Sequence, residues 1–318
     1  MHMKFFLVLV LAHIIADFIT QTQHMVQQKY LFSSPYFSKG ILYHCIHHIG
    51  ISLILSIFFL EWTFSTLLII PLIGIIHYFI DLAKIKSEKY LLTHQMKERY
   101  ENQFWYHLFK QKKILFFIGD QIAHLISIYL ILFLVSGHIS TDELMQLFAT
   151  EIYDKDSEMK YLMVTILVVL VTFPSAHFIS IVMNDIEGEK AEHEIAASLA
   201  PETKQKGQLK NQLEALHTDL VITEAYKEEN YSLQVQYHQF YNTNEDPRGR
   251  YIGMLERILI TVFIVSNLIQ GLALIIAMKT LTRFKQFEDK RFAEYYLIGT
   301  LLSLLIGIIL ALMIKKIW

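Results

Sequence analysis

Seven stretches of about 20 mostly apolar residues constrain the fold of this chain more than any other feature. Each is long enough to cross a bilayer as a helix, and the charged share of 18% is well below that of soluble proteins. The predicted spans are residues 5–22, 39–60, 63–83, 114–136, 161–184, 255–278 and 292–314. We therefore expect an all-α, polytopic membrane protein with about seven transmembrane helices.

Two polar segments interrupt this pattern and divide the chain. Residues 84–113 mix lysine and arginine with aromatic residues, which is typical of an interfacial helix lying on anionic lipid. Residues 185–250 are rich in Glu, Lys and Gln, and they predict either a soluble helical or coiled-coil lobe or a solvated linker. The expected domains are a four-helix transmembrane domain (1–136), an extracytoplasmic acidic loop with the fifth helix (137–184), the lobe (185–250) and two C-terminal transmembrane helices (251–318).

The distribution of positive charge predicts the orientation of these segments. Cytoplasmic loops carry an excess of Lys and Arg, so residues 84–113 and the 185–250 insertion should be cytoplasmic in a multi-pass protein of the bacterial inner (cytoplasmic) membrane. Seven crossings would then put the basic segment 279–291 outside, against the same rule. Either one late segment does not span, or these charges lie on a helical extension.

Charge and cysteine content exclude several classes of protein. A net charge of −2 provides no general basic field, so no nucleic-acid partner is expected. The single cysteine, Cys45, excludes an intramolecular disulfide and a cysteine-based zinc module. The expected partners are the lipid bilayer, anionic lipid at residues 84–113, and a second copy or another protein at residues 185–250.

Ionisable residues recur inside the first four predicted spans, where they are costly and indicate function. They form four pairs with i,i+4 spacing, so each helix presents two such side chains on one face. The pairs are His13 with Asp17, His44 with His48, His77 with Asp81, and Asp120 with His124. Because successive helices alternate in direction, a rise of about 1.5 Å per residue puts all four pairs at a similar depth.

Imidazole and carboxylate groups together suit a divalent transition metal, with zinc as the first choice and manganese or iron as alternatives. All eight residues are candidate ligands, which is more than one ion needs, so some would support the ligands or a second ion would be present. Asp17 and Asp120 are candidate general bases. The same pairs could instead relay protons or lock the helices together, and His47 points away from the shared face.

These motifs resemble an uncharacterised bacterial membrane family, the domain of unknown function DUF3307, over about residues 4–135. The motifs are LAHIIADF (11–18), His44 with His48, HYFID (77–81) and DQIAH (120–124). Residues 253–257 and 293–300 are similar to a recurrent tail of longer members. The His/Asp pattern is similar, more distantly, to YdjM-like inner-membrane metal-dependent hydrolases, whose first His-Arg motif has no clear copy here. The resemblance to DUF3307 implies a shared site and no particular reaction.

The leading functional hypothesis is an intramembrane metal-dependent hydrolase of a lipid or of a lipid-linked phosphate or ester. Metal ions lower the pKa of bound water toward neutrality, which provides a nucleophile for such a reaction. A cation- or proton-coupled transporter or channel is the first alternative, although the last three spans contain few polar residues for a path. A membrane effector of a signalling or defence system, gated through residues 185–250, is the other.

Overall fold

The computed structural model describes residues 2–32, 34, 36–59, 64–91, 113–136, 157–198, 220–222, 235–237 and 247–318, and these are almost entirely helical. The helices are α1 (His2–Ile14), the π-helix η1 (Ile15–Ile19), α2 (Gln23–Lys29), α3 (Lys39–Phe59), α4 (Phe64–Leu91), α7 (Lys113–Ser136), α10 (Ser157–Ser198), α12 (Pro247–Val265), α13 (Gly271–Thr282), the 3-10 helix η2 (Phe284–Glu288) and α14 (Lys290–Ile317). Two short strands, β1 (Leu220–Ile222) and β2 (Val235–Tyr237), pair antiparallel.

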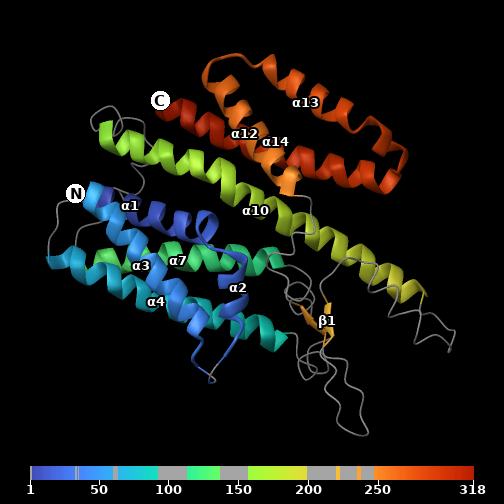
Figure 1. Ribbon diagram of the computed structural model, residues 1–318. Helices are drawn as coiled ribbons and strands as arrows, with labels where there is room; N and C mark the ends of the chain where they lie inside the picture. The colour runs from blue at the N-terminus through green and yellow to red at the C-terminus, as the bar shows by residue number, and fades with distance from the viewer. Residues whose placement is uncertain are drawn as a thin grey trace, which may run out of the picture.

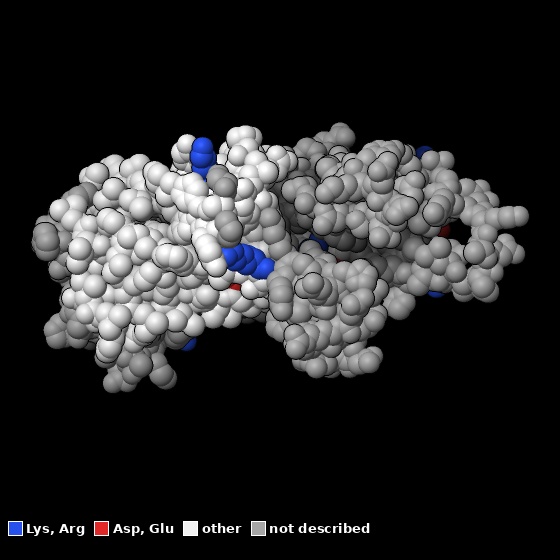
Figure 2. All heavy atoms as spheres, turned by 90° about the horizontal axis from the view of Figure 1, so that it is seen from below, with Lys and Arg blue, Asp and Glu red and all other residues white. Residues whose placement is uncertain are grey.

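Among the described residues, five helices are long and apolar enough to cross a membrane, as in a membrane protein. They lie at 39–59, 66–88, 113–135, 157–186 and 290–317. Figure 2 shows that the described part of one face is nearly free of charged side chains, as expected for a surface that contacts lipid. Five of the seven predicted spans thus correspond to helices of this kind among the described residues. Helices α1 and α12 fall outside this set.

The N-terminal helices form one bundle with α1 in its core. Val8 and Ala12 of α1 are completely buried, and α1 shares a hydrophobic core with α4, α7 and α10. Figure 1 shows α1, α3, α4 and α7 together on one side of the long helix α10. Because α3, α4 and α7 are antiparallel neighbours, the start of α3, the end of α4 and the start of α7 lie at one end of the bundle.

Helix α2 covers that end, which we call the α2 end. The hydroxyl of Ser38 donates to the carbonyl of Lys29 over 2.9 Å, and the hydroxyl of Tyr30 donates to Glu88 of α4 over 3.2 Å. Gly40 has no room for a Cβ atom, because the backbone of Gln28 occupies that position. The glycine therefore allows α2 and α3 to pack backbone against backbone.

Helix α10 joins this bundle to the C-terminal helices. It packs on α1 and α7 on one side and on α12 and α14 on the other (Figure 1). Pro174 interrupts its hydrogen-bond ladder, because proline lacks an N–H group. The hydroxyl of Ser175 donates to the carbonyl of Leu170 over 2.5 Å. The guanidinium group of Arg257 on α12 donates to the carbonyls of Val171 and Thr172.

The sixth predicted span, residues 255–278, is not a single helix, which corrects the sequence-based prediction. The chain leaves the helix after Val265, Asn267 has a positive φ of 60°, and α13 begins at Gly271. Helices α12 and α13 form an antiparallel hairpin, since Lys279 of α13 forms a 2.7 Å ion pair with Glu256 of α12. The sequence missed this break because residues 264–270 remain apolar enough to extend a helical pattern.

The hairpin removes the conflict over the basic segment 279–291. The turn between α12 and α13 lies beside the end of α14, where Lys315 donates to Asn267 over 2.7 Å. The C-terminal Trp318 in turn accepts from Lys160, which is at the start of α10 and opposite the α2 end. Residues 279–291 thus lie toward the same end of the molecule as α2 and the end of α4 (Figure 1).

The polar segments differ in part from their predicted forms. Residues 84–91 continue α4 and Lys84 is mostly buried, so this part of the predicted interfacial helix belongs to the bundle. Residues 92–112, and with them the lipid contact predicted there, lie outside the described residues, as does the acidic loop at 137–156. Residues 185–198 extend α10, and β1 and β2 occupy six positions of the predicted helical lobe.

Candidate metal centre

The structure brings all eight predicted metal-ligating residues into one cluster near the α2 end of the bundle. His13 is on α1, Asp17 on η1, His44 and His48 on α3, His77 and Asp81 on α4, and Asp120 and His124 on α7. Seven are buried, and the side chain of Asp17 is only 12% exposed. The i,i+4 spacing explains this convergence, since it aims both side chains of each helix toward the same neighbours.

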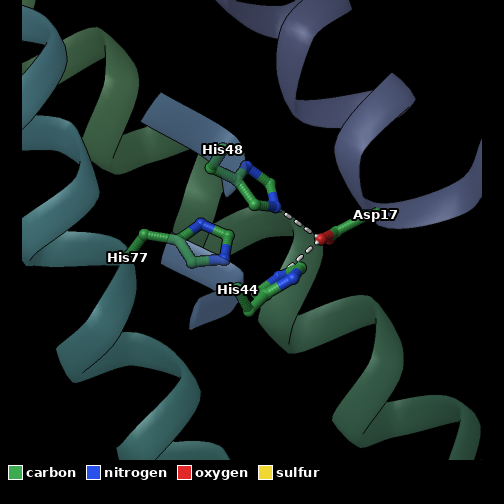
Figure 3. A group of neighbouring side chains, drawn as sticks. All are labelled: Asp17, His44, His48 and His77. Carbon is green, nitrogen blue, oxygen red and sulfur yellow. Dashed lines mark hydrogen bonds and ion pairs between the residues drawn. The ribbon is translucent and has the colours of Figure 1, made fainter. Parts of the chain in front are cut away.

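One group of ligand atoms surrounds Asp17. Its Oδ1 atom lies 2.9 Å from Nε2 of His48 and 3.1 Å from Nε2 of His44. His77 completes the group, and one ligand atom from each of the four residues lies within 4.8 Å of the others. Figure 3 shows the three imidazole rings facing the Asp17 carboxylate from α3 and α4. Four such atoms can close around an ion with bonds of about 2.0–2.2 Å, given small adjustments.

A second group shares His77 with the first. His77, Asp81 and His124 also place their ligand atoms within 4.8 Å of one another. The Asp81 carboxylate lies 3.7 Å from Nε2 of His77 and 3.9 Å from Nε2 of His124. The rings of His77 and His124 are 4.0 Å apart between centroids. The cluster can therefore hold one ion with alternative ligands, or two neighbouring ions.

Nε2 of His77 and Nε2 of His124 are buried without a hydrogen-bond partner among the described residues. The other nitrogen of His124, Nδ1, lies 2.8 Å from the backbone carbonyl of Asp120 and donates to it. This bond leaves Nε2 of His124 as the free lone pair that a metal requires. An unsatisfied buried nitrogen is costly, and a metal ion would satisfy both.

His13 and Asp120 lie beside the two groups and support them. The ring of His13 stacks on that of His124 at 4.9 Å, and its Nε2 atom is 3.5 Å from Asp17 Oδ2. Asp120 accepts from Lys84 over 2.9 Å through Oδ2, while Oδ1 is buried without a hydrogen-bond partner among the described residues. Gln121 lies between them and donates to Asp17 over 3.3 Å. His47 lies apart, 2.7 Å from the hydroxyl of Thr20.

A local π-helix positions Asp17. Residues Ile15–Ile19 form this turn, and the N–H of Thr20 donates to the carbonyl of Ile15 over 3.0 Å, five residues back. The Thr20 hydroxyl approaches the same carbonyl at 3.2 Å. π-Turns are rare and often mark functional positions. The apolar pattern of residues 5–22 carries no signal for this turn, so the sequence missed it.

Two lysines belong to the site and were not among the predicted residues. Lys29 of α2 forms a 2.9 Å ion pair with Asp81, and Lys84 of α4 forms a 2.9 Å ion pair with Asp120. Lys84 follows Asp81 by three positions on one helix face, a spacing that could have identified it. Lys29 has no such signal, because only the packing of α2 on α3 brings it to the cluster.

An open pocket adjoins the cluster on the side of these lysines. Its lining includes Asp17, Asp81, Asp120, Lys29, Lys84, Gln21, Gln121, Tyr30 and His177. His177 of α10 packs its ring on Phe18 and Phe117 at 5.8 and 5.3 Å. His177 was not among the predicted site residues, yet it forms part of the pocket wall.

A membrane-type helical bundle with a buried His/carboxylate cluster is the class of protein that these features define. Residues 5–153 match the family model DUF3307, described as a protein of unknown function. This N-terminal part is therefore similar to that family, as its motifs predicted, and it contains every residue of the cluster. No curated protein and no solved structure matches the chain. The distant likeness to YdjM-like hydrolases stays a prediction.

Proposed function

We propose that the protein is an intramembrane metal-dependent hydrolase of the bacterial inner membrane, acting on a lipid or on a lipid-linked phosphate or ester. The observation that carries the proposal is the convergence of two ligand groups on His77, with unsatisfied buried nitrogens on His77 and His124. A hydrogen-bonded structural lock would satisfy those nitrogens. A divalent transition metal, zinc first and manganese or iron second, satisfies them through coordination.

The residues divide into metal ligands and a base. Asp17, His44, His48 and His77 form the first ligand group, and His77, Asp81 and His124 form the second. The metal supplies activation of water at neutral pH. Asp17 already accepts from His48 and Gln121 and is close to His44, so it is better suited as a ligand than as a base. Asp120 keeps one buried carboxylate oxygen unbonded among the described residues and is the better candidate base.

The reaction balances with water as the only co-substrate. The water oxygen forms a bond to the phosphorus or acyl carbon, and the bond from that atom to the leaving oxygen breaks. One water proton passes to Asp120, and the leaving oxygen finally gains a proton as Asp120 returns to its carboxylate form. The pocket beside the cluster borders Asp120 and Asp17, so it provides the space in which a substrate group can meet the base and the ligands.

The surroundings of the cluster support hydrolysis over transport. A second pocket, on the other side of the histidines, is lined by Leu9, Ile49, Ile70, Ile73 and Ile128, with Ser52 and Ser127 as its hydroxyl groups. A transported cation would need polar groups along such a path, since an unsolvated ion in an apolar environment is very costly. The cluster is therefore open toward the α2 end and apolar toward the other end.

Metal analysis of the full chain, purified in detergent without chelators, tests the proposal. We expect about one or two equivalents of zinc, manganese or iron per chain, and metal-dependent release of phosphate or acid from lipid substrates. Asp120→Asn should keep the metal and lose hydrolysis, because it removes the base and leaves both ligand groups intact. A chain that stays fully stable without metal and takes up neither zinc nor manganese contradicts the proposal.

A further inference from the structure

The pocket beside the cluster has a charge balance that depends on metal. Three carboxylates (Asp17, Asp81 and Asp120) and two ammonium groups (Lys29 and Lys84) line it, and the Glu88 carboxylate lies behind Tyr30, so this group of charges has two excess negative charges. One bound divalent ion balances them, and two ions, one for each ligand group, leave two excess positive charges. Uncompensated charge at a mostly buried site is costly, so the pocket beside two bound ions requires an anion.

The two lysines at the pocket are mostly buried and ion-paired. The side chains of Lys29 and Lys84 are only 12% and 18% exposed, and they come from different elements, α2 and α4. Lys29 forms an ion pair with Asp81 and Lys84 with Asp120. Lysine is a common phosphate-binding residue that acts as a point charge. Both lysines therefore present positive charge to an anion in the pocket.

Neutral polar groups complete the lining. The amides of Gln21 and Gln121 and the hydroxyl of Tyr30 border the same pocket. Burial raises the pKa of Tyr30 well above its usual range, and the neighbouring Glu88 carboxylate, which accepts from the Tyr30 hydroxyl, adds to this effect. Tyr30 therefore remains neutral at physiological pH and adds no negative charge to the pocket. A polar wall of this kind, with two cations among neutral polar groups, suits an oxyanion.

We propose that the pocket between α2, α4, α7 and α10 binds the phosphoryl group of the substrate through Lys29 and Lys84. This inference rests on the proposed function and narrows it, since a neutral carboxylic ester would leave the pocket beside two bound ions with excess positive charge. The substrate is then a phosphate ester, whose phosphoryl group lies between the lysines and the metal ligands. Lys29 and Lys84 also position Asp81 and Asp120 for the same reaction.

Binding of inorganic phosphate to the manganese-loaded full chain in detergent tests this assignment. Paramagnetic manganese shortens the ³¹P relaxation time of phosphate bound next to it, so the signal reports both binding and proximity. We expect Lys29→Met and Lys84→Met each to weaken phosphate binding by about tenfold or more. Lys84→Arg should restore most of the affinity. Lys86→Met is the matched control, because Lys86 lies over the Tyr36 ring and does not line the pocket.

The outcomes separate this inference from the proposed function. A chain that binds manganese, but whose phosphate signal is unaffected or independent of both lysines, overturns the phosphoryl pocket and leaves the metal site intact. Lysine-dependent phosphate binding without hydrolysis of any phosphate ester supports the pocket and overturns the hydrolase. A chain that binds no manganese overturns both. Metal content and thermal stability, measured on each variant, identify variants that fail to fold.

Competition identifies the source of the phosphoryl group. The manganese-loaded chain is placed in nanodiscs of phosphatidylcholine, with or without phosphatidic acid, and inorganic phosphate is added. Displacement of phosphate by phosphatidic acid assigns the pocket to a lipid headgroup with a terminal phosphate. Retention of phosphate in both membranes assigns it to a soluble phosphate ester.

Discussion

The N-terminal bundle and the C-terminal helices both bury charged groups, but they treat them differently. In the bundle, four helices aim histidines and carboxylates at one point, and nitrogens of His77 and His124 remain without hydrogen bonds among the described residues. In the C-terminal part, Arg257 is only 2% exposed, yet it donates to the carbonyls of Val171 and Thr172 and to the hydroxyl of Ser303. The first arrangement leaves buried polar atoms without hydrogen bonds among the described residues, and the second gives its buried guanidinium group three acceptors.

This comparison distinguishes a site from a structural contact. Arg257 satisfies carbonyls next to Pro174, where helix α10 has lost part of its hydrogen-bond ladder. The guanidinium group therefore joins α12 to the irregular part of α10. An apolar side chain at this position could not donate to the carbonyls of Val171 and Thr172. Each buried charge is explained by counting the partners of its polar atoms, since burial alone does not distinguish the two roles.

The largest expected effect is the loss of metal from the bundle. His77→Ala removes the residue that both ligand groups share, so bound metal and hydrolysis should fall to background, as measured by elemental analysis and activity. Insertion into the membrane should persist, because removal of a polar group makes it easier. His47→Ala is the control and should retain metal. Equal effects of the two variants on stability, with metal retained in both, would favour a structural lock.

The two regions should also share an orientation in the membrane. In a background lacking Cys45, Gln27→Cys on α2 and Lys285→Cys on η2 should be protected from an impermeant thiol reagent in spheroplasts, while Ser157→Cys should be labelled. The physical reason is that the hairpin of α12 and α13 returns the basic segment to the α2 end, which the positive-inside rule makes cytoplasmic. Labelling at position 27 or 285, but not at both, would contradict the hairpin.

Arg257 should matter for stability and not for metal. Arg257→Ala removes the side-chain donor from the buried carbonyls of Val171 and Thr172. This loss should lower the free energy of unfolding by about 3 kcal/mol. Unfolding by detergent titration measures the loss, and elemental analysis should show unchanged metal. Lys290→Ala, at an exposed position of α14, should change little. Loss of metal from Arg257→Ala would mean that the two regions are coupled more tightly than the comparison implies.

The smallest expected effect concerns the contact of α10 with α7. Asp185 accepts from the backbone N–H of Ile114 over 3.0 Å and so acts as a cap for the start of α7. Asp185→Ala should lower the free energy of unfolding by about 1 kcal/mol, as measured by the same titration. Asn184→Ala, its exposed neighbour, is the control. An unchanged stability in Asp185→Ala would show that α7 does not depend on this cap.

Much of the bundle and its cluster followed from local sequence patterns. Apolar stretches of sufficient length predicted α3, α4, α7, α10 and α14, because the bilayer sets the length of a spanning helix. The break of the sixth predicted span was missed, since Ser266 and Asn267 are too few polar residues to interrupt an apolar pattern. The buried position of Lys84 was missed because its charge was assigned to the neighbouring basic segment.

The sequence by itself determined which side chains share a helix face, because the i,i+4 spacing is a property of the helix. It therefore predicted the pairs from His13 and Asp17 through to Asp120 and His124. Only the tertiary structure decided that the pairs meet at His77, that a π-turn carries Asp17, and that α2 brings Lys29 to Asp81. Those features depend on how helices pack against one another, through contacts such as Gly40 with the backbone of Gln28, and no local pattern encodes such contacts.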